Sequence, residues 1–435
     1  MTTTVSLPSL PKDREFEEYV SAYLQASGLY VERSIINREE EEILELDIIT
    51  TEYSDSSAPE ETLIEVKSGS WGFSEIFKLI GWGNYLNLEN IDLVVCKKKG
   101  NQEFYEKKAS DIGVQLRYHS NDTDNPDGSD IANNELVDPL DIANWRFSYW
   151  LERVLFNKLT TKKKSLKSKK CYKALDNYLF TINSGIFFTK NIIKRADKIY
   201  DAYKEQPHLS AKVGNELDGK DFDDEHETIP TNIFGDTFYK SQFNDISIST
   251  YVEYRARLAL LKAAVDFSLF EKYGIEERIK HEIKMLGLSF SLKNMLPDSF
   301  LEGLEEIKKH SHYESYPILW QHFLWLFGGF ILEDYKEHEY KILSMKTGVP
   351  VEEVENALKA FDLLFPIPGG WFNPSNANSN ITHLKMFSMP FMGIGANYRR
   401  LMYGGEDGYD GLTLTGTYTR SDLRSWNNLV VDVLT

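Results

Sequence analysis

Hydrophobic and polar positions follow two different periods in the first part of the chain. Apolar residues recur at helical spacing within Arg14–Ser27, and Gly28 ends that pattern. Three short runs of strand-like composition follow, at Tyr30–Asn37, Ile43–Thr50 and Thr62–Ser68. Polar, turn-forming residues separate the runs. The pattern predicts one helix and then three strands, the first two of them joined as a hairpin.

Helical and strand-like patterns alternate in the next segment. Ser74–Leu88 has helical spacing, and Ile91–Cys96 is a continuous apolar run, typical of a strand covered on both faces. A shorter helix around Phe104–Ile112 leads to a last strand, Gly113–Tyr118. This order predicts an α/β domain in which helices flank a mixed central sheet.

The composition changes after this domain. Residues 120–137 are rich in Asn, Asp, Ser and Gly, which indicates a linker. Residues 1–119 are then an N-terminal domain, and residues 138–435 are a large, mainly α-helical region whose role stays open: sensing, DNA binding or oligomerisation. Long amphipathic stretches predict its helices, at Trp145–Leu159, Lys173–Lys204, Tyr251–Lys272 and Tyr316–Tyr335.

Two further segments of the helical region have recognisable patterns. Leu209–Ser247 is polar and turn-rich, which predicts a long loop or insertion. Ile342–Pro366 predicts two helices around a turn that contains Gly348. The second of these helices begins with acids at Glu352 and Glu353, which a DNA-reading helix rarely presents. A structural helical pair is therefore favoured there.

Charge and cysteine content limit the class of protein. The chain has 435 residues, 42% of them hydrophobic, and a formal net charge of -18. Such an acidic chain is a poor general binder of phosphate, but carboxylates are also what a metal-dependent site needs, and positive charge can be concentrated locally. Cys96 and Cys171 lack metal-like spacing, and the longest apolar stretch, Ile318–Leu332, is too short to span a bilayer. We expect a cytoplasmic protein with no membrane contact.

Acidic and basic residues share one face of the third predicted strand. Side chains alternate across a strand, so Glu65 and Lys67 point to the same side as Leu63. Pairing with the preceding strand can bring Asp47 close to Glu65. Two carboxylates form a site for a hard divalent cation, and an adjacent ammonium can polarise water or meet phosphate charge. Other Glu-x-Lys sequences, starting at Glu106, Glu282, Glu306 and Glu339, all have helical context, where the two residues do not share a face.

These residues and the order of elements around them resemble the PD-(D/E)XK, or restriction-endonuclease-like, nuclease superfamily. The resemblance covers Lys12–Tyr118. Asp47 matches the family's aspartate, although Leu46 stands where many members have proline, and Glu65-Val66-Lys67 matches the (D/E)-x-K element. Glu17 looks like the helix glutamate of many members, particularly those similar to Mrr-type restriction enzymes and archaeal Holliday-junction resolvases.

The resemblance implies a Mg²⁺-dependent endonuclease, with Mn²⁺ able to substitute. Asp47, Glu65 and the Val66 carbonyl would bind the metal, Lys67 would assist the attacking water, and Glu17 would bind or orient the hydration shell. The implied reaction is hydrolysis of phosphodiester bonds in DNA, and the implied context is prokaryotic restriction or antiviral defence. Cutting both strands of a duplex usually needs two active sites, so a homodimer is expected.

Several lysines are candidate contacts for a nucleic-acid backbone. Lys78 lies in the second predicted helix beside Trp82 and Tyr85, where it could reach the site or a phosphate. Aromatic residues at helical spacing are more often part of a core. The other candidates follow the fourth strand or lie in a lysine-rich run; they are Lys97, Lys98, Lys162, Lys163 and Lys164.

Four other interpretations remain open at this point. Asp47, Glu65 and Lys67 can be ordinary surface charges, since exposed ion pairs are common and nearly neutral in energy. The domain can be a degenerate nuclease fold that only binds nucleic acid. It can be a repair or recombination nuclease for branched or single-stranded DNA. It can also be an effector whose nuclease is gated by a protein partner or ligand bound to the helical region.

Overall fold

The computed structural model describes most of the N-terminal part of the chain and several segments of the rest. The described residues are 7–38, 42–54, 57–123, 130–132, 137–165, 228–230, 237–239, 245–273, 298–364, 381–383, 391, 394–395, 398–399 and 402. The predicted helix Lys173–Lys204, Cys171, Glu282 and most of the C-terminal tail lie outside them.

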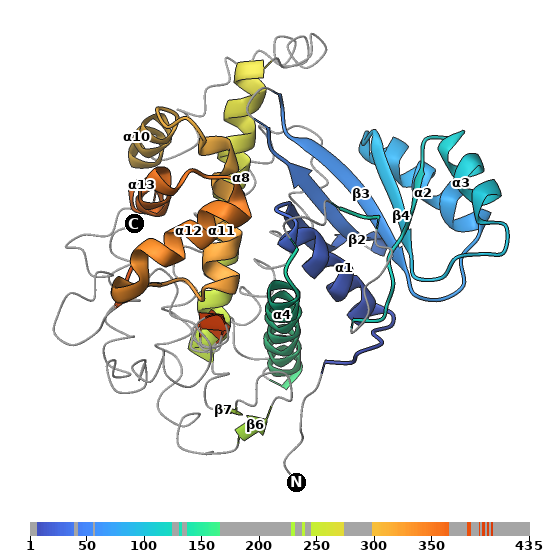
Figure 1. The fold of residues 1–435 in the computed structure, drawn as a ribbon, viewed down its shortest axis with the longest axis horizontal. Coiled ribbons are helices and arrows are strands. Elements are labelled where there is room, and N and C mark those ends of the chain that lie inside the picture. The colour runs from blue at the N-terminus through green and yellow to red at the C-terminus, as the bar shows by residue number, and fades with distance from the viewer. Residues whose placement is uncertain are drawn as a thin grey trace.

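A five-stranded mixed sheet forms the centre of the N-terminal part, with the strands in the order β1-β2-β3-β4-β5 (Figure 1). Strands β1 (Tyr30–Arg38), β2 (Glu42–Glu52) and β3 (Glu60–Lys67) are antiparallel. Strands β4 (Asn90–Val95) and β5 (Gln115–Tyr118) continue the sheet parallel to β3. All five predicted strands are confirmed, as is the mixed sheet.

Helices cover both faces of this sheet. Helix α1 (Arg14–Ala26) packs on one face, and α2 (Phe73–Leu86) and α3 (Gln102–Ser110) pack on the other. The alternation of side chains along each strand explains the two cores. Ile48, Ile64 and Val94 face α1, whereas their neighbours face α2; these neighbours are Ile49, Leu63 and Val95.

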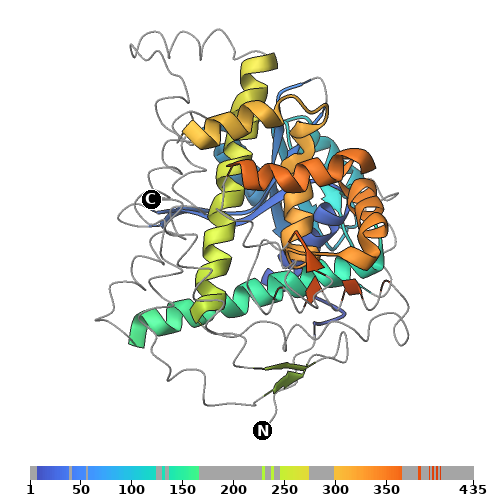
Figure 2. The same cartoon turned by 90° about the vertical axis from the view of Figure 1, so that its left-hand side faces the viewer.

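The described part of the C-terminal region is mainly helical and packs on the α1 side. Helix α4 (Pro139–Ser165) lies along α1, and α8 (Asp245–Tyr273) crosses α4 (Figures 1 and 2). Helices α10 (Asp298–Ile307), α12 (Lys336–Thr347) and α13 (Val351–Leu364) complete this layer. The predicted pair of helices around Gly348 is confirmed: Gly348 ends α12 with a φ of 74°, a left-handed conformation that glycine adopts without strain.

The prediction of one helix over Tyr316–Tyr335 is wrong. Helix α11 (Tyr316–Gln321) continues as a π-helical turn, His322–Leu326, and then stops. Gly328 and Gly329 have φ angles of 71° and 76°, so the chain reverses there. It continues as β8 (Ile331–Leu332) and a 3-10 turn, Glu333–Tyr335. Apolar content kept the segment buried, but the glycine pair ended the helix.

Short strands of two or three residues and a 3-10 turn complete the described elements. Strand β8 pairs with β9 (Ile381–Thr382). Strands β6 (Thr228–Pro230) and β7 (Thr237–Tyr239) form a hairpin inside the segment predicted as a long loop. A further 3-10 turn, Tyr313–Ser315, precedes α11. No helix among the described residues is long and apolar enough to cross a membrane.

His119, the last residue of the predicted N-terminal domain, and the beginning of the predicted linker lie against α1 and the residues before it. His119 is fully buried, and its ring lies 4.7 Å from the rings of Tyr19 and Tyr23 in α1. Asn121 donates a hydrogen bond to the Pro11 carbonyl at 3.1 Å, and the Thr123 N–H donates to Ser9 at 2.9 Å. These contacts connect residues 119–123 to the N-terminal part.

Candidate active site

The candidate site lies where strands β2 and β3 separate. Their antiparallel pairing runs from Glu52↔Glu60 to Ile48↔Ile64, so Asp47 and Glu65 are the next residues in register. The ladder stops there. An oxygen of the Asp47 carboxylate accepts a hydrogen bond from the Val66 N–H at 2.8 Å, in place of a backbone partner. The end of the pairing thus sets two carboxylates beside each other and orients one of them.

Glu65 is buried and partly paired. Its side chain lies on the α2 face of the sheet with Leu63 and Lys67, as the alternation predicts, and the residue is only 2% exposed. Its Oε1 accepts hydrogen bonds from Lys67 Nζ at 2.5 Å and from Lys78 Nζ at 3.0 Å. Its Oε2 is buried and has no hydrogen-bond partner among the described residues. Such an oxygen costs free energy unless a proton or a cation meets it.

Burial and negative charge act together on Asp47. Burial raises the pKa of this carboxyl to about 8, and the charges of Glu65 and Glu17 contribute in the same direction. The Val66 N–H and the Lys67 charge oppose the rise without cancelling it. The site therefore favours a proton or a cation that neutralises Asp47.

Lys67 is held in its charged form. Burial lowers the pKa of this ammonium, but the hydrogen bond and the charge of Glu65 outweigh burial, so its pKa lies above the ordinary value. Lys67 therefore carries a positive charge at neutral pH. In this state it acts as a fixed cation and hydrogen-bond donor rather than as a base.

Glu17 reaches the same group of charges from α1. Burial raises the pKa of Glu17, and the charge of Glu45 adds to the rise, whereas Arg33 and Lys67 oppose it. A contact between the ends of two elements helps to place α1. The Asp13 N–H, just before the helix, donates to the Ser68 hydroxyl, just after β3, at 2.8 Å.

An open cleft of about 320 Å³ is lined by four of the candidate residues, whereas Glu17 and Val66 do not line it. Asp47, Glu65, Lys67 and Lys78 line it, together with residues that sequence reasoning did not select, namely Ile43, Leu44, Glu45 and Trp82. Glu45 could have been found, because it is two positions from Asp47 and shares its side of an ideal strand. Trp82 packs against the core under α2, as the helical spacing of the aromatic residues indicated, and it also forms part of the cleft wall.

Comparisons of this chain with protein-family models, with curated proteins and with solved structures give no match. The geometry of the cleft therefore has to carry the functional argument.

The site fits a hard divalent cation by its donor chemistry. No group of three or more His, Cys, Asp or Glu side chains in the described ranges is arranged to hold a metal ion. Mg²⁺, however, is commonly held by one or two carboxylates, with water and substrate phosphate completing its octahedron. Asp47 and the unpaired Oε2 of Glu65 can supply those two ligands. The metal-binding role of the Val66 carbonyl stays a prediction.

The other predicted nucleic-acid contacts are outside this cleft or outside the description. Lys97 and Lys98 are exposed after β4, and Lys98 Nζ lies 4.5 Å from the centre of the Tyr118 ring. Neither lysine lines the cleft. Lys162, Lys163 and Lys164 belong to α4, but their side chains are not among those described. Their roles stay predictions.

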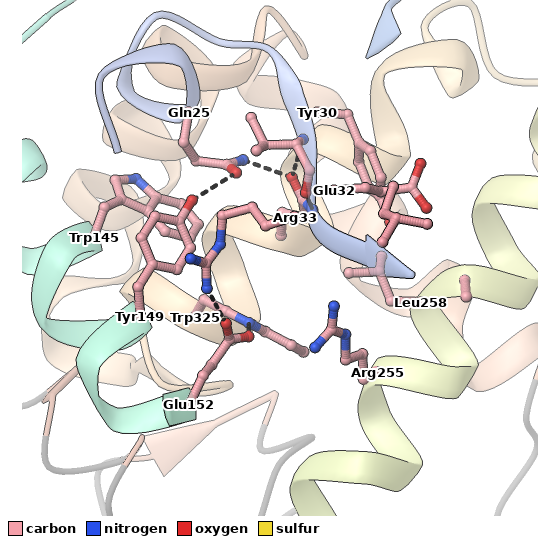
Figure 3. A pocket seen from close by; sticks show the side chains of 14 residues that line it. Gln25, Tyr30, Glu32, Arg33, Trp145, Tyr149, Glu152, Arg255, Leu258 and Trp325 are labelled. Atoms are coloured by element: carbon pink, nitrogen blue, oxygen red, sulfur yellow. Dashed lines mark hydrogen bonds and ion pairs between the residues drawn. The ribbon is translucent and has the colours of Figure 1, made fainter. Parts of the chain in front are cut away.

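A polar junction connects β1 to the helical region on the α1 face of the sheet, whereas the cleft lies on the α2 face. Arg33 of β1 pairs with Glu152 of α4 at 2.6 Å, and its guanidinium lies 3.7 Å from the centre of the Tyr149 ring (Figure 3). The second Glu152 oxygen accepts a hydrogen bond from the Trp325 indole at 2.9 Å. These side chains line a small cavity, and Arg255 of α8 points toward it (Figure 3).

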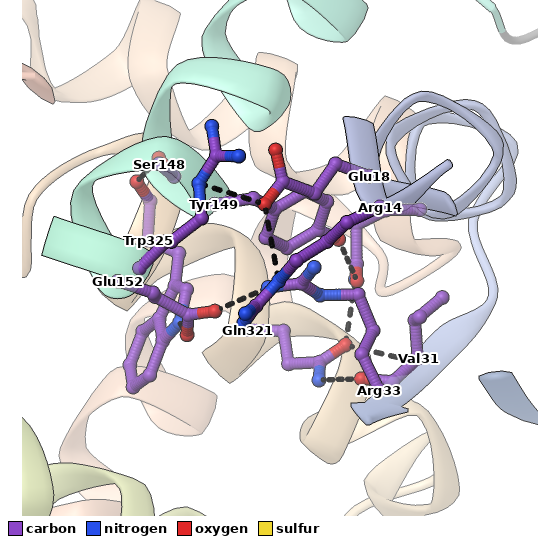
Figure 4. Close-up of polar contacts among 11 residues, drawn as sticks. Arg14, Glu18, Val31, Arg33, Ser148, Tyr149, Glu152, Gln321 and Trp325 are labelled. Atoms are coloured by element: carbon purple, nitrogen blue, oxygen red, sulfur yellow. Dashed lines mark hydrogen bonds and ion pairs between the residues drawn. The ribbon is translucent and has the colours of Figure 1, made fainter. Parts of the chain in front are cut away.

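Gln321 of α11 pairs with the backbone of β1 at this junction (Figure 4). Its Oε1 accepts a hydrogen bond from the Val31 N–H at 3.1 Å, and its Nε2 donates to the Val31 carbonyl at 2.9 Å. Gln25 of α1 donates to the same Oε1 at 2.6 Å. One side chain therefore satisfies both backbone groups of a residue at the sheet edge.

Proposed function

We propose that this protein is a metal-dependent endonuclease that hydrolyses phosphodiester bonds in DNA, with a restriction-endonuclease-like N-terminal domain. The observation that supports it is the convergence of Asp47, Glu65 and Lys67 where β2 and β3 separate, with one Glu65 oxygen buried and unpaired. An ordinary exposed ion pair would not bury a carboxylate so completely, nor leave one of its oxygens without a partner.

Two carboxylates of the site would bind the metal ion, and Lys67 would supply positive charge. Asp47 and Glu65 would hold Mg²⁺ or Mn²⁺, which supplies Lewis acidity and a bound water of lowered pKa. The Val66 N–H orients Asp47. Lys67, charged and hydrogen-bonded to Glu65, directs one carboxylate oxygen and places positive charge where the phosphoryl group becomes more negative.

Lys78 is a second cation at the same carboxylate. Its Nζ lies 3.0 Å from Glu65 Oε1, on the oxygen that Lys67 also uses. A carboxylate that accepts from two ammonium groups can give one of them up when a phosphate approaches. Lys78 then contacts the phosphate, as its position in the cleft allows.

Cleavage of DNA by purified wild-type protein beside Lys67→Ala tests the proposal. Supercoiled plasmid and circular single-stranded DNA are incubated with Mg²⁺, with Mn²⁺ and with EDTA. We expect metal-dependent cutting by the wild type and a loss of about 100-fold or more in the variant, because a positioned donor to developing charge is removed. Lys108→Ala, which removes a lysine from an exposed ion pair with Asp111, is the matched control and should cut normally.

Cutting that persists in Lys67→Ala would identify a contaminant or a different site, and the assignment would be wrong. Metal binding gives an independent readout. A thermal shift on adding Mn²⁺ that is present in the wild type and absent in Glu65→Gln supports the ligand assignment even where no DNA is cut.

A nuclease gated from the helical region is the second candidate function. Arg33 supports it, because its charge lowers the pKa of Glu17 while its guanidinium is paired with Glu152 of α4. A movement of α4 would therefore change the charge around Glu17. A wild-type protein that binds metal but leaves DNA intact until a partner or ligand is added would favour this alternative.

A further inference from the structure

One wall of the candidate cleft carries an aromatic stripe from α2. Lys78, Trp82 and Tyr85 are separated by four and three positions, so they lie on one face of the helix. Trp82 lines the cleft beside the carboxylates, and Tyr85 is 48% exposed further along the helix. Lys78 connects the stripe to the site: its Nζ lies 4.0 Å from the centre of the Trp82 ring and 3.0 Å from Glu65.

Aromatic faces at a phosphodiester-cutting site discriminate between paired and unpaired bases. In a duplex each base face is covered by its neighbours, so a protein reads only base edges in the grooves. In a single strand the bases can unstack and lie on aromatic side chains, with about 1–3 kcal/mol per stacked base. Trp82 is therefore better suited to a single strand than to a duplex.

The charge of the cleft also favours a single strand over a duplex. Its two cations, Lys67 and Lys78, both contact Glu65, and Glu45 is a further carboxylate in the lining. The whole chain carries a formal charge of -18. Duplex DNA presents about one phosphate charge per 1.7 Å of axis, twice the density of one strand. An acidic protein with few free cations at its site meets less repulsion from a single strand.

We propose that the cleft binds single-stranded DNA, or an unpaired segment of it, with bases stacked on Trp82 and Tyr85 and a phosphate beside Lys78. This inference rests on the proposed function, because it names the substrate class of the same site. Ile43, which is 54% exposed and also lines the cleft, supplies a second apolar surface for a base.

Binding measured in EDTA tests the inference without cleavage. A fluorescently labelled 15-nucleotide oligo(dT) and a duplex of the same length are titrated with full-length protein, and anisotropy gives each dissociation constant. We expect tighter binding of the single strand. Trp82→Ala should weaken it about tenfold, the equivalent of about 1.4 kcal/mol, whereas Trp82→Phe keeps a ring and most of the affinity.

Phe77→Ala is the matched control. Phe77 is an exposed aromatic residue of α2, at 62% exposure, and it does not line the cleft. Binding by this variant should equal that of the wild type. Equal melting temperatures and circular dichroism spectra establish that Trp82→Ala is folded, and Trp82→Phe covers the case in which it is not.

The outcomes separate this inference from the proposed function. Tighter binding of the duplex, or single-strand binding unaffected in both Trp82 variants, overturns the inference and leaves Lys67-dependent cleavage standing. Trp82-dependent binding of the single strand, with neither metal-dependent cutting of any DNA nor a thermal shift on adding Mn²⁺, overturns the nuclease proposal and leaves a single-strand-binding cleft. A protein that binds neither DNA overturns both.

Discussion

Asp47 is an acid in an environment that disfavours its charge. Burial raises its pKa to about 8, and two neighbouring carboxylates, Glu65 and Glu17, add to the effect. An acid whose pKa is higher in the folded than in the unfolded protein opposes folding once the pH favours its ionisation. The candidate site is therefore assembled at a cost in stability, which a bound cation would offset.

Replacing Asp47 by Asn should stabilise the metal-free protein in a pH-dependent way. The unfolded carboxyl ionises near pH 4 and the folded one near pH 8, so wild-type stability falls as pH rises through this window. Asn keeps an acceptor for the Val66 N–H but has no charge. We expect the melting temperature in EDTA to be at least roughly 2 °C above wild type at pH 8, with a smaller difference at pH 5.

The same variant should lose the stabilisation that Mn²⁺ gives the wild type. A metal-free Asp47→Asn protein that is no more stable than the wild type at pH 8 would contradict the environment described for this carboxyl.

Gln321 joins two elements that are far apart in sequence. Its amide meets the Val31 N–H and C=O of β1 and the Gln25 side chain of α1, and the residue is only 9% exposed. Gln321 therefore supplies the hydrogen bonds that a further strand would give to Val31 at the edge of the sheet. The helical region is attached to the sheet by a specific hydrogen-bond pattern in addition to apolar contact.

Gln321→Leu should destabilise the protein by about 2–4 kcal/mol, because buried backbone groups of Val31 lose their partners. Urea unfolding followed by circular dichroism measures the change. Gln102→Leu makes the same chemical change in α3, where the amide donates to an exposed Glu106 side chain and accepts from one part-buried backbone N–H, that of Lys99; it should cost less, about 1 kcal/mol. Equal losses in the two variants would show that the Gln321 contacts add nothing specific.

One hydrophobic core extends from the sheet into the helical region. It includes Ile48 and Val94 of the sheet, Tyr19 of α1, Trp145 of α4 and Leu319 of α11. Helix α1 is buried on more than the face toward the sheet, since every residue from Glu18 to Ala26 is buried. The sheet and the helical layer therefore share the helix that lies between them.

A fragment that ends at residue 138 should fail to behave as a soluble, cooperatively folded domain. Without α4, the outer face of α1 loses the cover that Trp145 and Tyr149 provide. An exposed apolar face of this kind promotes aggregation. Size-exclusion chromatography and urea unfolding of the fragment, with the full chain as control, measure this. A monomeric fragment with a cooperative transition would show instead that residues 1–138 fold independently.

Local patterns predicted the elements of the sheet and the central residues of the site. The alternation in Leu63-Ile64-Glu65-Val66-Lys67 assigned Glu65 and Lys67 to one face correctly, because the period of two is a property of any strand. The expected proximity of Asp47 to Glu65 holds for the same reason: a short hairpin-like pairing leaves few registers that bury both apolar sets.

Contacts between distant segments could not be predicted in this way. Nothing local to Gln321 or Val31 indicates that they pair, and nothing local to Asp13 or Ser68 indicates their hydrogen bond. The burial of α1 on several faces depends on α4, which follows more than a hundred residues later. Periodicity in the sequence thus determined which residues share a face. Tertiary packing decided which faces meet, where the β2–β3 ladder ends and which Glu65 oxygen stays unpaired, because those depend on groups that only the folded chain brings together.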